Sequence, residues 1–67
     1  MTIVFEVSEN VKEKMIRFYK DKMKEKTPPY AVFQAVDADT VITLYESNKV
    51  MFQGLSADIE ANLWRDM

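Results

Sequence analysis

Hydrophobic and polar residues alternate with a period of two in four stretches of this chain, and such alternation predicts β-strands. The first stretch is TIVFEV, residues 2–7, in which Ile3, Phe5 and Val7 share one side. The other three stretches are residues 30–37, 40–46 and 49–53. The turn sequences Asp37–Thr40 and Ser47–Asn48 separate them. Because these connections are so short, the last three strands are predicted to form an antiparallel meander.

A helical spacing of apolar residues follows the first strand. Ser8 supplies an N-cap hydroxyl, and the predicted helix runs from Glu9 to about Glu25. Its apolar stripe consists of Val11, Met15, Phe18, Tyr19 and Met23. The sequence Thr27-Pro28-Pro29 ends the helix, since proline does not continue one.

A second helix is predicted at the C-terminal end of the chain. Gly54, the only glycine, is expected to adopt a positive φ before it. Ser56 is expected to cap a helix over residues 57–66. Its apolar residues Ile59, Leu63 and Trp64 are expected to be buried.

The strand pattern assigns each side chain to one of two sheet faces, because adjacent side chains point in opposite directions. The more apolar set is predicted to face the helices: Ile3, Phe5, Val7, Ala31, Phe33, Ala35, Ile42, Leu44, Val50 and Phe52. The opposite face, called the open face below, then carries Val4, Glu6, Tyr30, Val32, Gln34, Val36, Val41, Thr43, Tyr45, Lys49, Met51 and Gln53. The predicted fold is therefore α+β in two layers, β-α-β-β-β-α. It has a mostly antiparallel curved sheet with both helices on one face.

Composition limits what this chain does. With 67 residues, 48% of them hydrophobic, and a net charge of −2, the chain is predicted to be a single folded domain, residues 1–67. It contains neither cysteine nor histidine, which excludes disulfides, thiolate metal sites and histidine-based catalysis, and favours a cytoplasmic location. No apolar run approaches the roughly 20 residues that a membrane span requires.

Charge is unevenly distributed along the chain. Residues 12–26 contain seven basic and three acidic residues, a local charge of +4, whereas residues 27–67 contain two basic and six acidic residues, a local charge of −4. A solvated helix face with Glu/Lys pairs accounts for the basic run. A patch that faces phosphate groups is the functional alternative.

The acidic residues do not predict a catalytic centre. Two-metal hydrolysis of a phosphodiester needs several converging carboxylates. Asp37 and Asp39 lie in one turn, and Asp58 and Glu60 lie in the first turn of one helix. Turn formation and the helix dipole explain both pairs, so we expect no enzyme activity and no cofactor in this chain alone.

The open face is the main functional feature that the pattern predicts. Its valines and methionine offer flat apolar contacts, and its glutamines, threonine and tyrosines offer hydrogen bonds without a charge. Contiguous apolar area of this kind usually marks a binding surface. The alternatives are a homodimer or other protein interface, packing against further chain, and ordinary exposure of single valines.

The sequence AVFQAVDADTVITLYESNKVMFQG, followed by SADIEANLW, resembles the N-terminal domain of bacterial ribonuclease HIII. The matching pattern is an A-V-F-Q-A strand, a T-x-Y strand, an S-N-K-V strand and an F-Q-G turn into a helix. The resemblance implies a fold like one half of the TATA-box-binding protein, although a full half-repeat has four strands after its first helix and this chain shows three.

The resemblance also implies a function. The domain would bind an RNA/DNA hybrid for a C-terminal catalytic domain in cis, which would cleave the RNA strand with Mg or Mn and is absent from this chain. The implied binding residues are Tyr30, Gln34, Thr43, Tyr45, Lys49, Met51 and Gln53. These residues also belong to the open face that the alternation pattern predicts.

Overall fold

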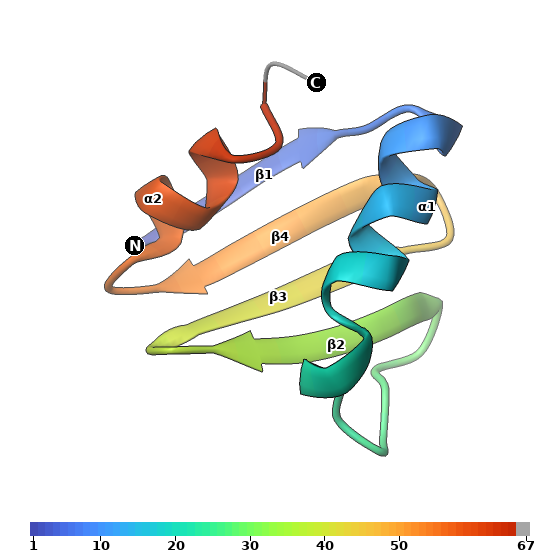
Figure 1. Ribbon diagram of the computed structural model, residues 1–67, viewed down its shortest axis with the longest axis horizontal. Helices are drawn as coiled ribbons and strands as arrows, with labels where there is room; N and C mark the ends of the chain where they lie inside the picture. Colours follow the sequence, from blue (N-terminus) through green and yellow to red (C-terminus); the bar gives the residue numbers. More distant parts are fainter. Residues whose placement is uncertain (66–67) are drawn as a thin grey trace.

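The computed structural model describes residues 1–65, which form an antiparallel sheet with helices on one face (Figure 1). The strands are β1 (Thr2–Glu6), β2 (Ala31–Asp37), β3 (Thr40–Tyr45) and β4 (Lys49–Gly54). The helices are α1 (Glu9–Phe18), the short 3₁₀ helix η1 (Lys20–Lys22) and α2 (Ala57–Asn62). The strand order is β1-β4-β3-β2, and every strand pair is antiparallel. The predicted α+β class, meander and element order are confirmed.

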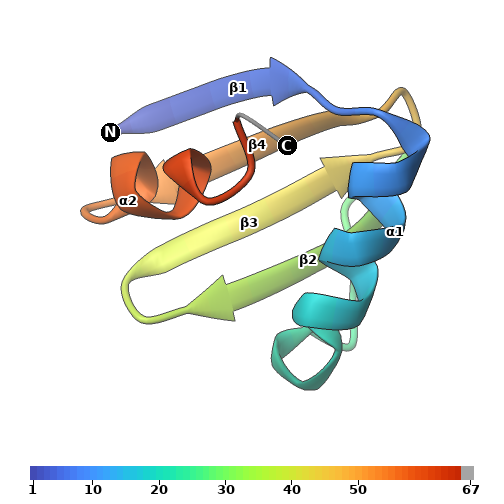
Figure 2. The ribbon, with the colours of Figure 1, turned by 45° about the horizontal axis from the view of Figure 1, so that its top comes forward.

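Both helices pack on the same face of the sheet (Figure 2). The core between the layers contains aliphatic and aromatic side chains from both, including Val11 and Met15 of α1 and Tyr19 just after it. Phe52 is fully buried, and its ring stacks on the ring of Phe5 with 5.6 Å between the centroids. Within residues 1–65, no helix is long and apolar enough to cross a membrane.

The first helix is shorter than the predicted span of residues 9–25. Ser8 caps it as expected, because its hydroxyl accepts a hydrogen bond from the Val11 amide at 3.3 Å. The helix ends at Phe18, and Met23 then forms an isolated antiparallel bridge with Ala35 on β2. Residues 20–26 contain one apolar side chain, so a longer helix would extend into solvent with little surface to bury.

A β-bulge corrects the predicted side-chain parity at the start of β2. The pairing with β3 shifts register between Ala31 and Phe33. Ala31 therefore pairs with Tyr45 of the open face, and Val32 packs against the core instead of lying on the open face. From Phe33 onwards the two faces follow the predicted alternation, with Phe33 and Ala35 buried.

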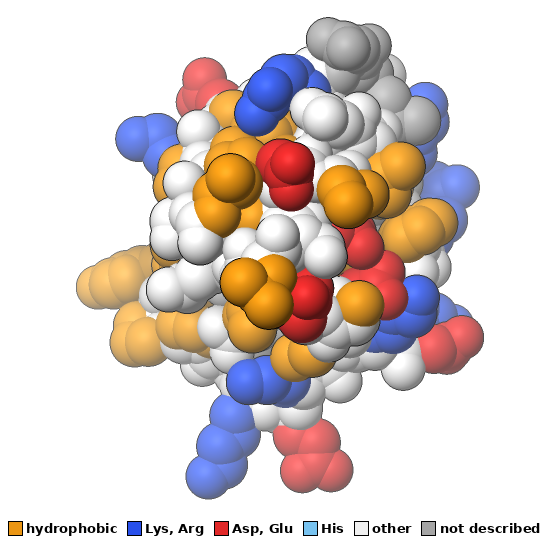
Figure 3. Space-filling model, turned by 90° about the vertical axis from the view of Figure 1, so that its left-hand side faces the viewer, with side chains coloured by type: hydrophobic (Ala, Val, Ile, Leu, Met, Phe, Trp, Pro, Cys, Tyr) orange, Lys and Arg blue, Asp and Glu red, His pale blue; other side chains and the backbone are white. Residues whose placement is uncertain are grey.

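The second helix also differs from the prediction. It ends at Asn62 within the described chain, and the Ser56 side chain makes no capping hydrogen bond. Trp64 is buried as predicted, but Ile59 and Leu63 are exposed. The face of α2 that meets the sheet instead carries Ala57, Glu60 and Ala61. Hydrophobic side chains consequently reach the surface on this side of the molecule (Figure 3).

Gly54 ends β4 in a conformation that other residues rarely adopt, as predicted, with φ = 146°. A Cβ atom at this position would also overlap the carbonyl oxygen of Asp39 in the neighbouring β2–β3 turn. We expect Gly54→Ala to lower the free energy of unfolding by about 1–3 kcal/mol through backbone strain, with the overlap adding to this loss. Urea titration of the purified variant measures the change.

Ala38→Gly is a matched control for this substitution. Ala38 lies in the same β2–β3 turn and has a φ of 55°, which glycine adopts without the steric cost of a Cβ atom. This change is expected to preserve or raise stability. If both substitutions lowered the free energy of unfolding equally, backbone strain at Gly54 would not explain the result.

Candidate nucleic-acid interface

The open face is the side of the sheet that points away from the viewer in Figure 1, and within residues 1–65 no helix covers it. Strand register sets its side chains in rows that cross the sheet. One row contains Val36, Val41, Gln53 and Thr2, and the next contains Gln34, Thr43, Met51 and Val4. Side chains within a row have Cβ atoms about 4.5–5.5 Å apart. Successive rows are two residues apart along each strand, which corresponds to about 6.6–6.8 Å.

Gln34 and Thr43 form a cross-strand pair at the centre of this face. The Gln34 Nε2 group donates a hydrogen bond to Thr43 Oγ1 at 3.1 Å. Thr43 has 0% of its surface exposed, so it offers no contact area of its own, in contrast to its predicted place among the binding residues. Its hydroxyl orients the Gln34 amide, whose carbonyl oxygen and second N–H extend the hydrogen-bonding capacity of the face.

The other predicted binding residues lie around this pair. Gln53 is exposed on β4, while Tyr45 and Met51 are half-buried. Tyr30 is 80% exposed and lies just before β2, where its φ of 66° places it in the left-handed region. Its carbonyl oxygen accepts a hydrogen bond from the Glu46 amide at 2.8 Å, which ties this loop to the end of β3.

The open face is close to electrically neutral. Lys49 is the basic residue among those assigned to it, and its direct partner across the β1–β4 ladder is Glu6. Both side chains are exposed. Opposite charges across a ladder attract each other, so Glu6 reduces the positive potential that Lys49 presents to a phosphate group.

Several residues of the basic run make contacts within the domain. Lys12 Nζ donates a hydrogen bond to Asn48 Oδ1 at 3.1 Å, which joins α1 to the β3–β4 turn. Arg17 lies 4.0 Å from Glu13 on α1, and Lys22 lies 3.4 Å from a carboxylate oxygen of Asp37. These contacts support the interpretation of the basic run as a solvated helix face. Its role toward phosphate stays a prediction.

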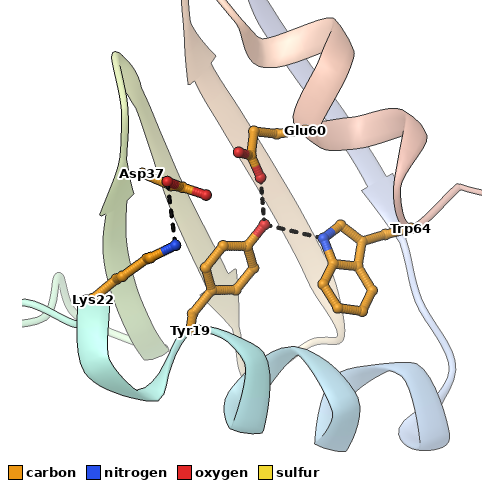
Figure 4. Close-up of polar contacts among 5 residues, drawn as sticks. All are labelled: Tyr19, Lys22, Asp37, Glu60 and Trp64. Atoms are coloured by element: carbon orange, nitrogen blue, oxygen red, sulfur yellow. Dashed lines mark hydrogen bonds and ion pairs between the residues drawn. The ribbon is translucent and has the colours of Figure 1, made fainter.

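A buried polar cluster joins the two helices above the sheet, and the sequence pattern gave no sign of it (Figure 4). The Tyr19 hydroxyl donates a hydrogen bond to Glu60 Oε2 at 2.7 Å. The Trp64 indole Nε1–H donates one to the Tyr19 hydroxyl oxygen at 3.0 Å. Within residues 1–65, every fully buried side-chain nitrogen and oxygen atom has a hydrogen-bond partner. The cluster therefore stabilises the packing of α2 against α1.

Burial dominates the acid–base properties of this cluster. It raises the pKa of Glu60 above its ordinary value, while the Tyr19 hydrogen bond lowers that pKa and the neighbouring Asp37 raises it. Burial, followed by the hydrogen bond to Glu60, raises the pKa of Tyr19 well above its ordinary range, so the hydroxyl stays protonated. These carboxylates thus have structural partners, and the described chain contains no group of three or more acidic residues that could hold a metal ion.

Comparison with known proteins identifies the family. Residues 2–67 match the family described as "Domain of unknown function (DUF3378)". Ribonuclease HIII from Enterococcus faecalis is 44% identical over 61 residues, which are 91% of this chain and 20% of that protein. Ribonuclease HIII from Bacillus cereus is 41% identical over 64 residues, which are 96% of this chain and 21% of that protein. This chain therefore spans about a fifth of the length of these relatives.

Solved structures agree with this relationship. Bst-RNase HIII in complex with Mn2+ superposes with a TM-score of 0.88 and 31% identity, over 96% of this chain and 21% of that one. Aquifex aeolicus RNase H3 has a TM-score of 0.78 at 12% identity, over 96% of this chain and 26% of that one, which shows a shared fold. The matched region of these relatives is their non-catalytic N-terminal part. This chain belongs to the DUF3378 family, whose domain forms the N-terminal fifth of ribonuclease HIII proteins.

Proposed function

We propose that this domain binds an RNA/DNA hybrid on its open face and holds it for a ribonuclease HIII catalytic domain. The observation that carries the proposal is the open face itself, which lies opposite both helices and presents Gln34 and Met51 in one cross-strand row and Gln53 in the next. Membership of a family found in ribonuclease HIII proteins supports nucleic acid as the ligand.

The chemistry of the open face suits a hybrid duplex. An A-like helix has a wide, shallow minor groove that displays 2′-hydroxyl groups and base edges. A broad, open sheet surface fits such a groove, and the Gln34 and Gln53 amides both donate and accept hydrogen bonds, as a 2′-hydroxyl also does. The near neutrality of the face favours groove contacts over a binding mode that depends mainly on phosphate charge.

Cleavage would then belong to the rest of the parent protein. Bst-RNase HIII was crystallised with Mn2+, and a catalytic domain of that type would cleave the RNA strand with a divalent metal, Mg or Mn. The present domain would contribute binding. A binding module linked to a catalytic domain raises the effective concentration of substrate at the active site without a new catalytic contact.

A nuclear magnetic resonance titration with a short RNA/DNA hybrid tests the proposal. We expect chemical-shift changes at backbone amides of β2, β3 and β4 and at the side-chain amides of Gln34 and Gln53. A double-stranded DNA of the same sequence is the matched ligand control, and weaker binding is expected because it lacks the 2′-hydroxyl groups. Shift changes confined to α1 and α2 would refute the assignment of the open face.

Lys49→Ala is expected to weaken hybrid binding and to reduce its dependence on salt. Each lysine that neutralises one phosphate contributes about one to the slope of log affinity against log salt concentration. Loss of the Lys49 contact should therefore flatten that slope by about one. Binding isotherms at several salt concentrations measure it, and an unchanged slope would place the phosphate contact on another surface.

Glu6→Gln is the opposite-charge control, because it removes a negative charge directly opposite Lys49. Removal of its negative charge should strengthen binding by roughly two- to fivefold at low salt, in keeping with the size of exposed charge interactions.

The same titration separates hybrid binding from the alternative of a homodimer or other protein interface on this face. Apolar association holds or strengthens as salt rises, whereas contact with phosphates weakens.

A further inference from the structure

Helix α2 and the residues that flank it carry apolar side chains on two sides, and one of these sides is exposed. Ala57, Ala61 and Trp64 face the core. Leu55 before the Ser56 cap, Ile59 within α2 and Leu63 at the C-cap are spaced four residues apart, and their exposed fractions are 84%, 65% and 50%. We call these three residues the α2 patch. A surface helix normally has one apolar stripe with polar residues opposite it, so a second apolar side indicates a second packing partner.

The surroundings of the α2 patch identify the class of that partner. Asp58 is exposed next to Ile59, and the backbone of the exposed residue Asp39 lies beside Gly54, the residue before Leu55. Figure 3 shows hydrophobic side chains interspersed with acidic ones on this side of the molecule. Acidic side chains repel phosphate groups, which argues against nucleic acid as the occupant. A two-fold contact with a second copy would bring the same carboxylates together, which argues against self-association.

We propose that the α2 patch docks against the catalytic part of the parent ribonuclease, through a protein surface with an apolar centre and a basic rim. This inference rests on the proposed function. The relatives match this chain over about a fifth of their length, in their N-terminal part, so four-fifths of such a protein lies beyond the matched region. Covalent linkage raises the effective concentration of that part, so a patch of three side chains is enough to orient it.

The position of the α2 patch is compatible with hybrid binding. Helix α2 lies in the helical layer, and the open face is on the opposite side of the sheet (Figures 1 and 2). One side of the domain would hold the duplex while α2 fixes the domain relative to the catalytic part. The buried contacts of Glu60 and Trp64 with Tyr19 fix α2 on the sheet, so docking at the patch would also fix the direction of the open face.

A fusion protein tests this docking. Residues 1–67 replace the matching region of Enterococcus faecalis ribonuclease HIII, and amide hydrogen exchange over residues 55–65 is compared between the fusion and the 67-residue chain. We expect exchange in this segment to be about tenfold slower or more in the fusion, since docking stabilises the helix against local opening. The double variant Ile59→Gln, Leu63→Gln should return the exchange in the fusion to the rates in the 67-residue chain.

Two controls keep the result unambiguous. Val4→Gln changes a 55% exposed valine in the other layer and should leave the slower exchange of the fusion intact. Circular dichroism verifies that each variant is folded. Equal exchange rates in the fusion and in the 67-residue chain would overturn the proposal. Slower exchange in the 67-residue chain at higher protein concentration would overturn it in favour of a second copy as the occupant.

Hybrid titration of the 67-residue chain distinguishes failure of this inference from failure of the proposed function. The double variant should bind the hybrid as the wild-type chain does, because its altered side chains lie on α2 and at its C-cap, in the helical layer. Absence of hybrid binding by the wild-type chain would contradict the proposed function. The exchange measurement would still decide whether the α2 patch docks, because it does not depend on the hybrid. Normal hybrid binding with equal exchange rates in the fusion and the chain would contradict the docking alone.

Discussion

Replacement of Phe52 by alanine is expected to leave the domain largely unfolded at room temperature. Phe52 has no exposed surface and stacks on Phe5, so the substitution removes a buried ring and leaves a cavity. Phenylalanine-to-alanine changes in protein cores cost about 3–5 kcal/mol. A single small core supplies about 3–5 kcal/mol of net stability, so this one change offsets most of it. Circular dichroism during urea or thermal unfolding measures the loss.

Gln53→Ala is the adjacent control for this change. The side chains of Phe52 and Gln53 point to opposite faces of β4, so Gln53→Ala should leave the unfolding transition nearly unchanged and should weaken hybrid binding. Phe33 and Gln34 repeat the comparison on β2, where Phe33 is buried. If either glutamine variant melted as low as its phenylalanine neighbour, the glutamine would contribute to folding and not to a ligand surface.

The strands and their faces are predictable from the sequence because a strand has a period of two and most of these strands bury one face. The exception is the β-bulge at Ala31–Phe33, which moves Val32 to the core. A bulge inserts one residue into a strand, and here no glycine or proline within β2 marks its position. The alternation pattern therefore assigns β2 side chains to the correct face after the bulge and to the wrong face before it.

The second helix was less predictable because six residues are too few to establish a helical period. Ile59 and Leu63 have the usual spacing of buried residues, but Ala57 and Ala61 have the same spacing and let the helix approach the sheet closely. Trp64 then packs in the core. The apolar spacing of Ile59 and Leu63 therefore predicts the exposed side of α2 as the core side. The same exposed apolar side is the observation behind the docking proposal.

Within the candidate interface, the sequence predicts which residues point away from the helices but not which of them are accessible. Thr43 shows the difference, since it lies on the open face with no exposed surface because Gln34 and other neighbours surround it. The cluster of Tyr19, Glu60 and Trp64 was missed for another reason. Tyr19 and Glu60 are 41 residues apart, and no local pattern encodes a pairing at that separation.

Tyr19→Phe is the second substitution with a large expected effect. It removes the hydroxyl that donates to Glu60 and accepts from Trp64. A hydrogen bond contributes about 0.5–1.5 kcal/mol, or about 1.5–3 kcal/mol where one partner is charged, and a buried donor without an acceptor costs about 1–3 kcal/mol. We therefore expect the free energy of unfolding at neutral pH to fall by about 2–5 kcal/mol. Urea titrations of the variant and the wild-type chain measure the difference.

The loss in Tyr19→Phe should depend on pH in a defined direction. Burial raises the pKa of Glu60 in the folded state above the ordinary value of 4.5. The contribution of Glu60 to stability is therefore greatest below pH 4.5 and decreases as pH rises through the folded-state pKa. The Tyr19 hydrogen bond lowers that pKa, so its removal raises the pKa further. The variant should then lose more stability than the wild-type chain as pH rises through this window.

Glu60→Gln removes the titratable carboxyl and leaves in place Asp37, which raises the Glu60 pKa, and Lys22, which lowers it. The glutamine side-chain oxygen still accepts a hydrogen bond from Tyr19, but it does not titrate. In a Glu60→Gln background, Tyr19→Phe should cost less, and its cost should be the same at low and neutral pH. If the cost of Tyr19→Phe were independent of pH with Glu60 present, the carboxyl would not titrate in this window. The cluster would then act through packing and the Trp64 hydrogen bond alone.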